Sequence, residues 1–115
     1  MKKLEIAKRY LDGLRRADPV LVGSLFCKDG VIDDYTGGHH LGRSGIQTFI
    51  RTLQPGQLYV SEPETWLEEG DRLTLWGRIG LVDEESRQDV RWIFHFDSDQ
   101  IAHLGNSRVD FFYTG

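Results

Sequence analysis

Hydrophobic residues follow a helical spacing in the first half of the chain and an alternating spacing in the second. Across residues 3–16 they recur at steps of three and four, which predicts an amphipathic helix with Tyr10 on its buried stripe. Asp18 and Pro19 are typical of a helix start, the first as N-cap and the second at the first helical position. We therefore expect a second helix that runs through Phe26 and stops at the Asp-Gly pair that follows.

A short strand and a third helix are predicted next. Residues 31–35 begin with β-branched side chains and lead into a glycine-rich turn, which is typical of a strand that ends in a loop. Ser44 is placed to cap the third helix, and Pro55 with the glycine after it is expected to end that helix. The apolar residues of this helix follow the i, i+3, i+4, i+7 spacing: Ile46, Phe49, Ile50 and Leu53.

The remainder of the chain predicts an antiparallel meander, because β-type runs alternate with short polar connections that suit hairpins. The four runs are residues 58–67, 72–82, 88–96 and 101–113. Pro63 cannot donate to a strand ladder, so it predicts a bulge or an edge in the first run. Three helices followed by a meander indicate an α+β fold, in which a cone-shaped, curved antiparallel sheet wraps the helices and leaves a cavity at its open end.

Alternation within the strands places bulky apolar side chains on both faces of the predicted sheet. Trp92, Phe94 and Phe96 share one face and are expected to line the core or a pocket. Ile93 lies on the other face, and Trp76 on the neighbouring run is also out of step with its apolar neighbours. Since large apolar groups on both faces are typical of an association surface, we expect a homodimer through the outer face of the sheet.

Composition narrows the class of protein. A chain of 115 residues suits one domain over residues 1–115. With a net charge of -4 and no Lys/Arg run longer than a pair, neither nucleic acid nor a membrane is an expected partner. Cys27 is the only cysteine, which excludes an intrachain disulfide, fits a cytoplasmic location and suggests a small buried filler. No apolar run approaches the roughly 18 residues of a membrane helix.

Candidate chemistry concentrates in residues 29–43, where carboxylates, imidazoles and glycines lie close together in the sequence. With a period of two, Asp33 and Asp34 point to opposite faces, and Asp34 is interpreted as the inward acid. His39 and His40 lack the spacing of a metal-binding motif, so no metal site is expected. We expect both histidines in a rim loop made flexible by the preceding glycines, where one of them is able to act as acid or base.

The chain resembles the nuclear transport factor 2-like superfamily over nearly its whole length, and within it the ketosteroid isomerases and the SnoaL-like polyketide cyclases. The segments that carry the resemblance are residues 9–14, 18–19, 25–26, 29–34, 42–46, 94–97 and 100–104. Because this superfamily contains isomerases, cyclases, dehydratases, epoxide hydrolases and non-catalytic domains, the resemblance is specific for the fold and much less so for the activity.

The ketosteroid isomerase pattern implies roles for two residues of this chain. Tyr10 matches the tyrosine that donates a hydrogen bond to the oxyanion, and Asp34 matches the general base, with the same spacing between them. Trp92 stands near the position of the second oxyanion acid and has no carboxyl group to donate, which makes steroid isomerisation doubtful. Proton transfer on a smaller or more acidic substrate, without any cofactor, is the activity that the pattern still allows.

A hydrophobic pocket for a small apolar or partly polar molecule is expected at the open end of the sheet. The residues expected to bind the ligand are Ile32, His39, His40, Phe49, Trp92, Phe94, Phe96, Leu104 and Asn106. Asn106 and Arg108 interrupt the last strand, and the sequence leaves open whether they face inward as polar anchors, for an anionic ligand among others, or outward.

Three functions remain open from the sequence. The first is a cofactor-independent isomerase or cyclase that uses Asp34 and Tyr10, and the second is a non-catalytic ligand-binding or dimerisation module whose interior is filled by side chains. The third is a hydrolase or dehydratase that uses His39 or His40 with Asp34. In the non-catalytic alternative Asp34 bonds the backbone amides of the turn after it, and Tyr10 is a core tyrosine bonded to a carbonyl.

Overall fold

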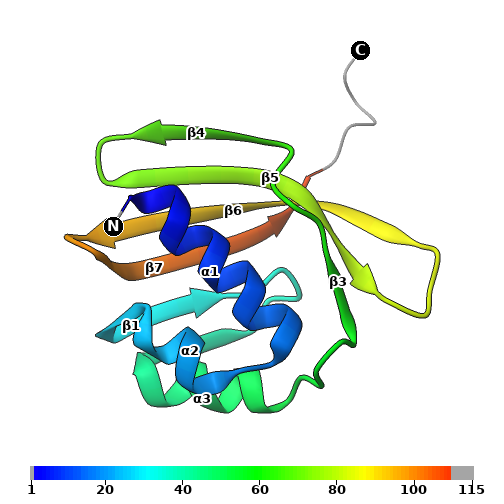
Figure 1. Cartoon of the computed structure of the whole chain (residues 1–115). Coiled ribbons are helices and arrows are strands. Elements are labelled where there is room, and N and C mark those ends of the chain that lie inside the picture. The colour runs from blue at the N-terminus through cyan, green and yellow to red at the C-terminus, as the bar shows by residue number, and fades with distance from the viewer. Residues whose placement is uncertain (1, 110–115) are drawn as a thin grey trace.

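Three helices come from the first half of the chain. A computed structural model, which describes residues 2–109, places them at α1 (Lys3–Arg16), α2 (Pro19–Ser24) and α3 (Gly42–Arg51) (Figure 1). Asp18 caps α2 as predicted, because its Oδ1 accepts the backbone N–H of Leu21 at 3.0 Å and Pro19 occupies the first turn. The predicted first helix is confirmed from its first to its last residue.

Two helix boundaries differ from the prediction. α2 ends at Ser24, and Phe26 begins strand β1 (Phe26–Asp33), where its backbone pairs with Ile101. The Asp-Gly pair after Phe26 lies within β1, at an irregularity of register, and does not stop a helix. α3 begins at Gly42, two residues before the predicted cap Ser44, and Leu41 precedes it without a side-chain cap.

The strands form one curled, mixed sheet in the order β2-β1-β7-β6-β5-β3, with β4 also paired to β5. Their bounds are His39–Leu41 for β2, Leu58–Val60 for β3, Thr65–Glu69 for β4, Arg72–Leu81 for β5, Arg87–Asp97 for β6 and Gln100–Arg108 for β7. β5, β6 and β7 form the predicted meander, whereas β1 runs parallel to β7, so the sheet is not wholly antiparallel. The predicted α+β fold class is confirmed.

The predicted run over residues 58–67 is two strands rather than one. Both strands pair with β5: β3 pairs with its end at residues 79–81, and β4 pairs with its beginning at residues 72–76. Pro63 lies in the break between β3 and β4. A proline has no N–H for the ladder, which explains why the chain leaves the sheet there and rejoins it. In the last predicted run, β7 ends at Arg108, and residues 110–113 lie outside the described part of the chain.

The core fills the space between α1 and the inner face of the sheet, which curls around the helix (Figure 1). Trp92 and Phe94 are 0% exposed, as the alternation along β6 predicts. Tyr10 on α1 is 2% exposed and meets Phe94 edge-on, with ring centres 5.8 Å apart. Side chains therefore fill the middle of the sheet, and any cavity must lie towards one end of it.

Candidate functional site

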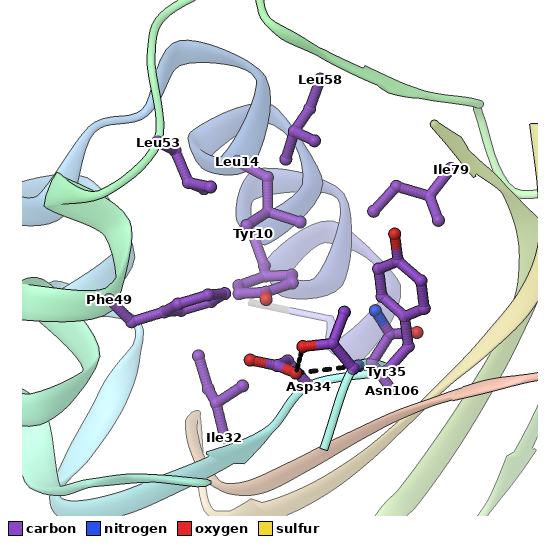
Figure 2. A pocket seen from close by; sticks show the side chains of 11 residues that line it. Tyr10, Leu14, Ile32, Asp34, Tyr35, Phe49, Leu53, Leu58, Ile79 and Asn106 are labelled. Atoms are coloured by element: carbon purple, nitrogen blue, oxygen red, sulfur yellow. Dashed lines mark hydrogen bonds between the residues drawn. The ribbon is translucent and has the colours of Figure 1, made fainter. Parts of the chain in front are cut away.

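A cavity of about 190 Å³ lies between α1, α3 and the ends of β1, β5 and β7 (Figure 2). Its walls are mainly apolar, with a few polar groups. The lining residues are Tyr10, Leu14, Ile32, Asp34, Tyr35, Thr36, Phe49, Leu53, Leu58, Ile79 and Asn106. An apolar, concave site with a few convergent polar groups is the usual form of a small-molecule site.

Asp34 lies directly after β1, in the turn that leads to β2, and its carboxylate is held by several donors. Oδ1 accepts the backbone N–H groups of Thr36 and Gly38, both at 2.9 Å, and the Thr36 hydroxyl at 2.6 Å. Burial raises the pKa of Asp34, but the hydrogen bonds from Thr36, His40 and Gly38 outweigh burial and lower the pKa to about 2. The carboxylate is therefore ionised at neutral pH, and it is a weak base.

His40 completes the set of donors around Asp34. Its Nε2 lies 2.8 Å from Oδ2 of Asp34, and its ring stacks on Phe49 with ring centres 4.0 Å apart. The side chain comes from β2, where His40 pairs with Ile32 of β1. The expected rim loop is therefore wrong for this histidine, because residues 39–41 pair with β1 as the second strand of a hairpin.

His39 lies on the opposite face of the same hairpin, since adjacent strand residues point to opposite sides. Its Nδ1 contacts Oδ1 of Asp33, and Nε2 of His103 lies 2.8 Å from the other oxygen of Asp33. The side-chain hydrogen bond from His39, followed by that from His103, lowers the pKa of Asp33. His39 and Asp33 are thus turned away from the cavity. Of the two histidines that the hydrolase alternative allowed as partners of Asp34, the structure places His40 there and not His39.

Tyr10 brings a hydroxyl into the cavity from the middle of α1. Figure 2 shows its ring projecting towards the carboxylate of Asp34. Burial, and then the negative charge of Asp34, raise the pKa of Tyr10, so its phenol stays protonated over the ordinary pH range. Within residues 2–109 the hydroxyl has no hydrogen-bond partner, so the carbonyl contact considered from the sequence is absent there.

Asn106 faces the cavity from β7, which settles the question that the sequence left open for this residue. Its Oδ1 is buried and has no hydrogen-bond partner in the described chain. Trp92 lies directly opposite on β6, fully buried, and its indole N–H also lacks a partner among residues 2–109. A buried polar atom without a partner is uncommon, and at a cavity wall it is a candidate for a ligand contact.

The expected ligand-binding residues divide into two groups. Ile32, Phe49 and Asn106 line the cavity together with Tyr10 and Asp34. The others are not among its described lining residues: Trp92, Phe94, Phe96 and Leu104 are core residues, His40 lies behind Asp34, and His39 lies on the outer face. The core residues fall outside because they fill the middle of the sheet, whereas the cavity lies at one end.

Several lining residues were not singled out from the sequence as part of the site. Leu14 lies one helical turn after Tyr10, and Leu53 follows Phe49 by the same spacing, so the helical periodicity contained a signal for both. Tyr35 had no such signal, because its position depends on the turn after β1. In the described part of the chain, no group of three or more His, Cys, Asp or Glu side chains is placed to hold a metal ion.

Comparison with known proteins gives the family of this chain. The family model described as the SnoaL-like domain matches residues 7–104. The chain belongs to the SnoaL-like family. The match runs from within α1 to within β7, so it includes every described lining residue of the cavity except Asn106. A comparison with curated proteins finds no match.

Solved structures share the fold of this SnoaL-like protein at low sequence identity. A protein from Sphaerobacter thermophilus has a TM-score of 0.82 at 22% identity, covering 96% of this chain and 99% of that one. A protein with a ketosteroid isomerase-like fold from Catenulispora acidiphila, in complex with trimethylamine, has a TM-score of 0.76 at 17% identity. The match covers 89% of this chain and 83% of that one. An LEH-like epoxide hydrolase from M. tuberculosis has a TM-score of 0.74 at 16% identity, covering 92% of this chain and 81% of that one.

These comparisons confirm the resemblance to the nuclear transport factor 2-like superfamily. They establish the family and the fold, while the chemistry has to be argued from the side chains of this chain. Among the described residues, no helix is long and apolar enough to cross a membrane.

Proposed function

We propose that this SnoaL-like protein binds a small, largely apolar molecule that carries one polar group. The observation that carries the proposal is the convergence of Tyr10 from α1, Asp34 from the turn after β1 and Asn106 from β7 on one apolar cavity. A dry apolar cavity of about 150 Å³ accommodates benzene. The cavity of about 190 Å³ therefore suits a molecule of one substituted ring, and a steroid nucleus is too large for it.

The polar groups define how such a molecule is held. The Tyr10 hydroxyl stays protonated and is able to donate a hydrogen bond to a carbonyl or hydroxyl oxygen of the ligand. Asp34 is ionised and accepts only. Its Oδ1 already has three donors, whereas Oδ2 has only His40 as a partner in the described chain, so Oδ2 is the oxygen with capacity left for the ligand. The apolar walls supply most of the affinity, and the polar pair orients the ligand.

The same arrangement supports acid–base chemistry without a cofactor. Oδ2 of Asp34 would take a proton from the carbon next to a ligand carbonyl, and the electron pair of that C–H bond would become the C=C bond of an enolate. The hydroxyl of Tyr10 would then donate a hydrogen bond to the enolate oxygen. With a pKa of about 2, Asp34 is a weak base, so proton transfer would be slow from a simple ketone such as acetophenone and faster from a substrate with a more acidic C–H bond.

A second candidate function is hydrolysis or dehydration, and the contact between Asp34 and His40 favours it. Oδ2 and Nε2 lie 2.8 Å apart, which is the geometry of a carboxylate that orients an imidazole for proton transfer. His40 is separated from the cavity by that carboxylate and by Phe49, so a substrate proton would have to pass through Asp34. This route predicts that activity depends on His40 and not on His39.

Acetophenone is a suitable probe, because it combines one ring, one carbonyl and exchangeable C–H bonds. We expect saturable binding by NMR titration, and incorporation of deuterium into its methyl group in D₂O. Asp34→Asn should lower the exchange rate by at least about 100-fold, and Tyr10→Phe by about 10- to 100-fold. Asp33→Asn is the matched control, since it removes the neighbouring carboxylate on the outer face.

The outcomes separate binding from catalysis. Binding without deuterium incorporation would support the ligand-binding module and reject the acid–base enzyme. If the Asp34→Asn and Tyr10→Phe variants bind and exchange like the wild type, neither residue has the proposed role. His40→Asn compared with His39→Asn then tests the hydrolase alternative on ester and epoxide probes of the same size.

A further inference from the structure

A second, more polar compartment of about 260 Å³ adjoins the cavity. Tyr35, Leu58 and Ile79 line both spaces, so these three residues form a shared wall. The outer compartment is completed by the turn between β5 and β6, which contributes Glu84 and Arg87 among others. A ligand large enough to occupy both spaces would therefore lie along Tyr35.

Arg108 lies beside Tyr35, which lines both compartments, although Arg108 is not itself a lining residue of either one. It follows Asn106 by two positions on β7 and pairs with the buried Val90, so it belongs to the inner face of the sheet at its open end. Its guanidinium carbon lies 5.7 Å from the centre of the Tyr35 ring. Within residues 2–109 Arg108 has no acidic partner, and it is exposed.

Arg87 also brings a positive charge to the outer compartment, but it is anchored by its surroundings. Its Nη1 donates to the carbonyl oxygens of Leu81 at 3.0 Å, Ser86 at 3.1 Å and Glu84. Its guanidinium carbon lies 4.3 Å from the centre of the Tyr59 ring. Arg87 is therefore a fixed charge in the compartment, whereas Arg108 is able to turn towards a ligand.

The charges along this path are unevenly distributed. At the inner end, Asp34 presents an ionised carboxylate to the cavity. At the outer end, Arg87 and Glu84 line the compartment, and Arg108 adds a second positive charge beside Tyr35. A ligand with a negative charge would be repelled at the inner end and attracted at the outer end, so its orientation would be set by charge as well as by shape.

We propose that the physiological ligand is an organic acid, with an apolar ring in the inner cavity and an anionic group in the outer compartment, held by Arg108 beside Arg87. The proposal rests on the proposed function, because it requires the inner cavity to bind the ring. It also accounts for a guanidinium on the inner face of β7, where the preceding inward positions are Leu104 and Asn106. This exposed arginine has no acidic partner among residues 2–109, so it is available for such a contact.

The test compares two probes of nearly equal shape, 3-phenylpropanoate and 3-phenylpropanamide, by isothermal titration calorimetry at 20 mM and 300 mM NaCl. In the wild type, we expect the acid to bind about 2- to 5-fold more tightly than the amide at low salt, since a partly exposed ion pair is modest. This preference should shrink at high salt, where charges are screened beyond a few ångströms.

Two variants with the same change of charge locate the effect. Arg108→Gln should abolish the preference for the acid and leave the affinity for the amide within about 2-fold. Arg91→Gln is the control, because Arg91 is an exposed arginine on the outer face of β6, bonded to Ser107. It should retain the preference.

The outcomes distinguish this proposal from the one on which it rests. If both probes bind equally in the wild type, or if Arg108→Gln keeps the preference, the inner cavity binds the ring and the assignment of the anionic group to Arg108 is wrong. If neither probe binds, and acetophenone does not bind either, the proposed function fails and this inference fails with it.

Discussion

Asp34 and His40 meet through a contact of 2.8 Å between Oδ2 and Nε2, in a space that exists because residue 38 is glycine. A Cβ atom at Gly38 would lie 3.0 Å from both Cγ of Asp34 and Nε2 of His40, and closer still to Oδ2. The backbone N–H of Gly38 also donates to Oδ1 of Asp34 at 2.9 Å. The turn between β1 and β2 thus sets the position of the carboxylate through one residue that acts both as a donor and by its small size.

Gly38→Ala should separate Asp34 from His40 and weaken ligand binding. Close contacts of this kind typically cost about 1–3 kcal/mol, and we expect the affinity for acetophenone to fall at least about 10-fold. Gly37→Ala is the control: Gly37 has φ 95, and a Cβ there would meet no atom within 4 Å, so alanine strains the backbone without touching the pair. If Gly37→Ala weakens binding as much as Gly38→Ala, the steric explanation is wrong.

Asp34 should make the stability of the protein depend on pH in the acid range. Its pKa is lowered from 3.8 to about 2, so the native state favours the ionised form. The resulting gain in folding stability is present at pH values above the pKa of Asp34 in the unfolded chain. At pH 7 the free energy of unfolding of the wild type should exceed that of Asp34→Asn by roughly 2 kcal/mol. That difference should shrink as the pH falls from about 4 to about 2. Urea denaturation of both proteins between pH 7 and pH 2.5 measures it, and a difference that stays constant contradicts the assignment.

Asn106 should reduce stability in the unliganded protein. Its Oδ1 is buried without a partner in the described chain, and a buried polar atom without a hydrogen bond costs about 1–3 kcal/mol. Asn106→Leu replaces the amide by an apolar group of similar size, and should raise the thermal midpoint by about 4 °C. Asn106→Ala removes the same atom but leaves a void, so it should gain less. A lower midpoint for Asn106→Leu in calorimetry would show that the amide is stabilising.

Association through the outer face of the sheet is a further prediction. Trp76 and Ile93 are only partly buried there, on the face opposite the core. We expect a homodimer in sedimentation velocity at micromolar concentration, and a monomer for Trp76→Glu, because a buried unpaired charge disrupts an apolar interface. Trp66→Glu is the control, since Trp66 on β4 is 49% exposed and pairs with Leu75 instead of facing that surface. A monomeric wild type would contradict the prediction.

Local patterns predicted most of the fold. The stripe that includes Tyr10 defines α1, and alternation along β6 places Trp92 and Phe94 inside. The errors occur where long-range pairing overrides local preference: Phe26 joins a strand because β7 lies beside it, and β2 forms because β1 offers an edge. The parallel pairing of β1 with β7 brings together segments far apart in the sequence, so no local pattern reports it.

The candidate site was predictable to a lesser degree. Alternation selected Asp34 as the inward acid, and the structure places it at the cavity with Tyr10. The donors that lower its pKa could not be foreseen, because they depend on the conformation of the turn that places Thr36 and Gly38 around Oδ1. The side chain of Asn106 was undetermined for the same kind of reason, since its direction depends on the register of β7.

The most direct test of the central claim is an NMR titration of ¹⁵N-labelled protein with acetophenone. The amides of Thr36 and Gly38 donate to Asp34, so they report on the polar end of the cavity. We predict saturable shifts of both amides in the wild type, and an affinity at least about 5-fold weaker in Tyr10→Phe. Folded wild-type protein whose Thr36 and Gly38 amides do not shift, or a Tyr10→Phe variant that binds equally well, would contradict the proposal that this cavity binds a ligand through Tyr10 and Asp34.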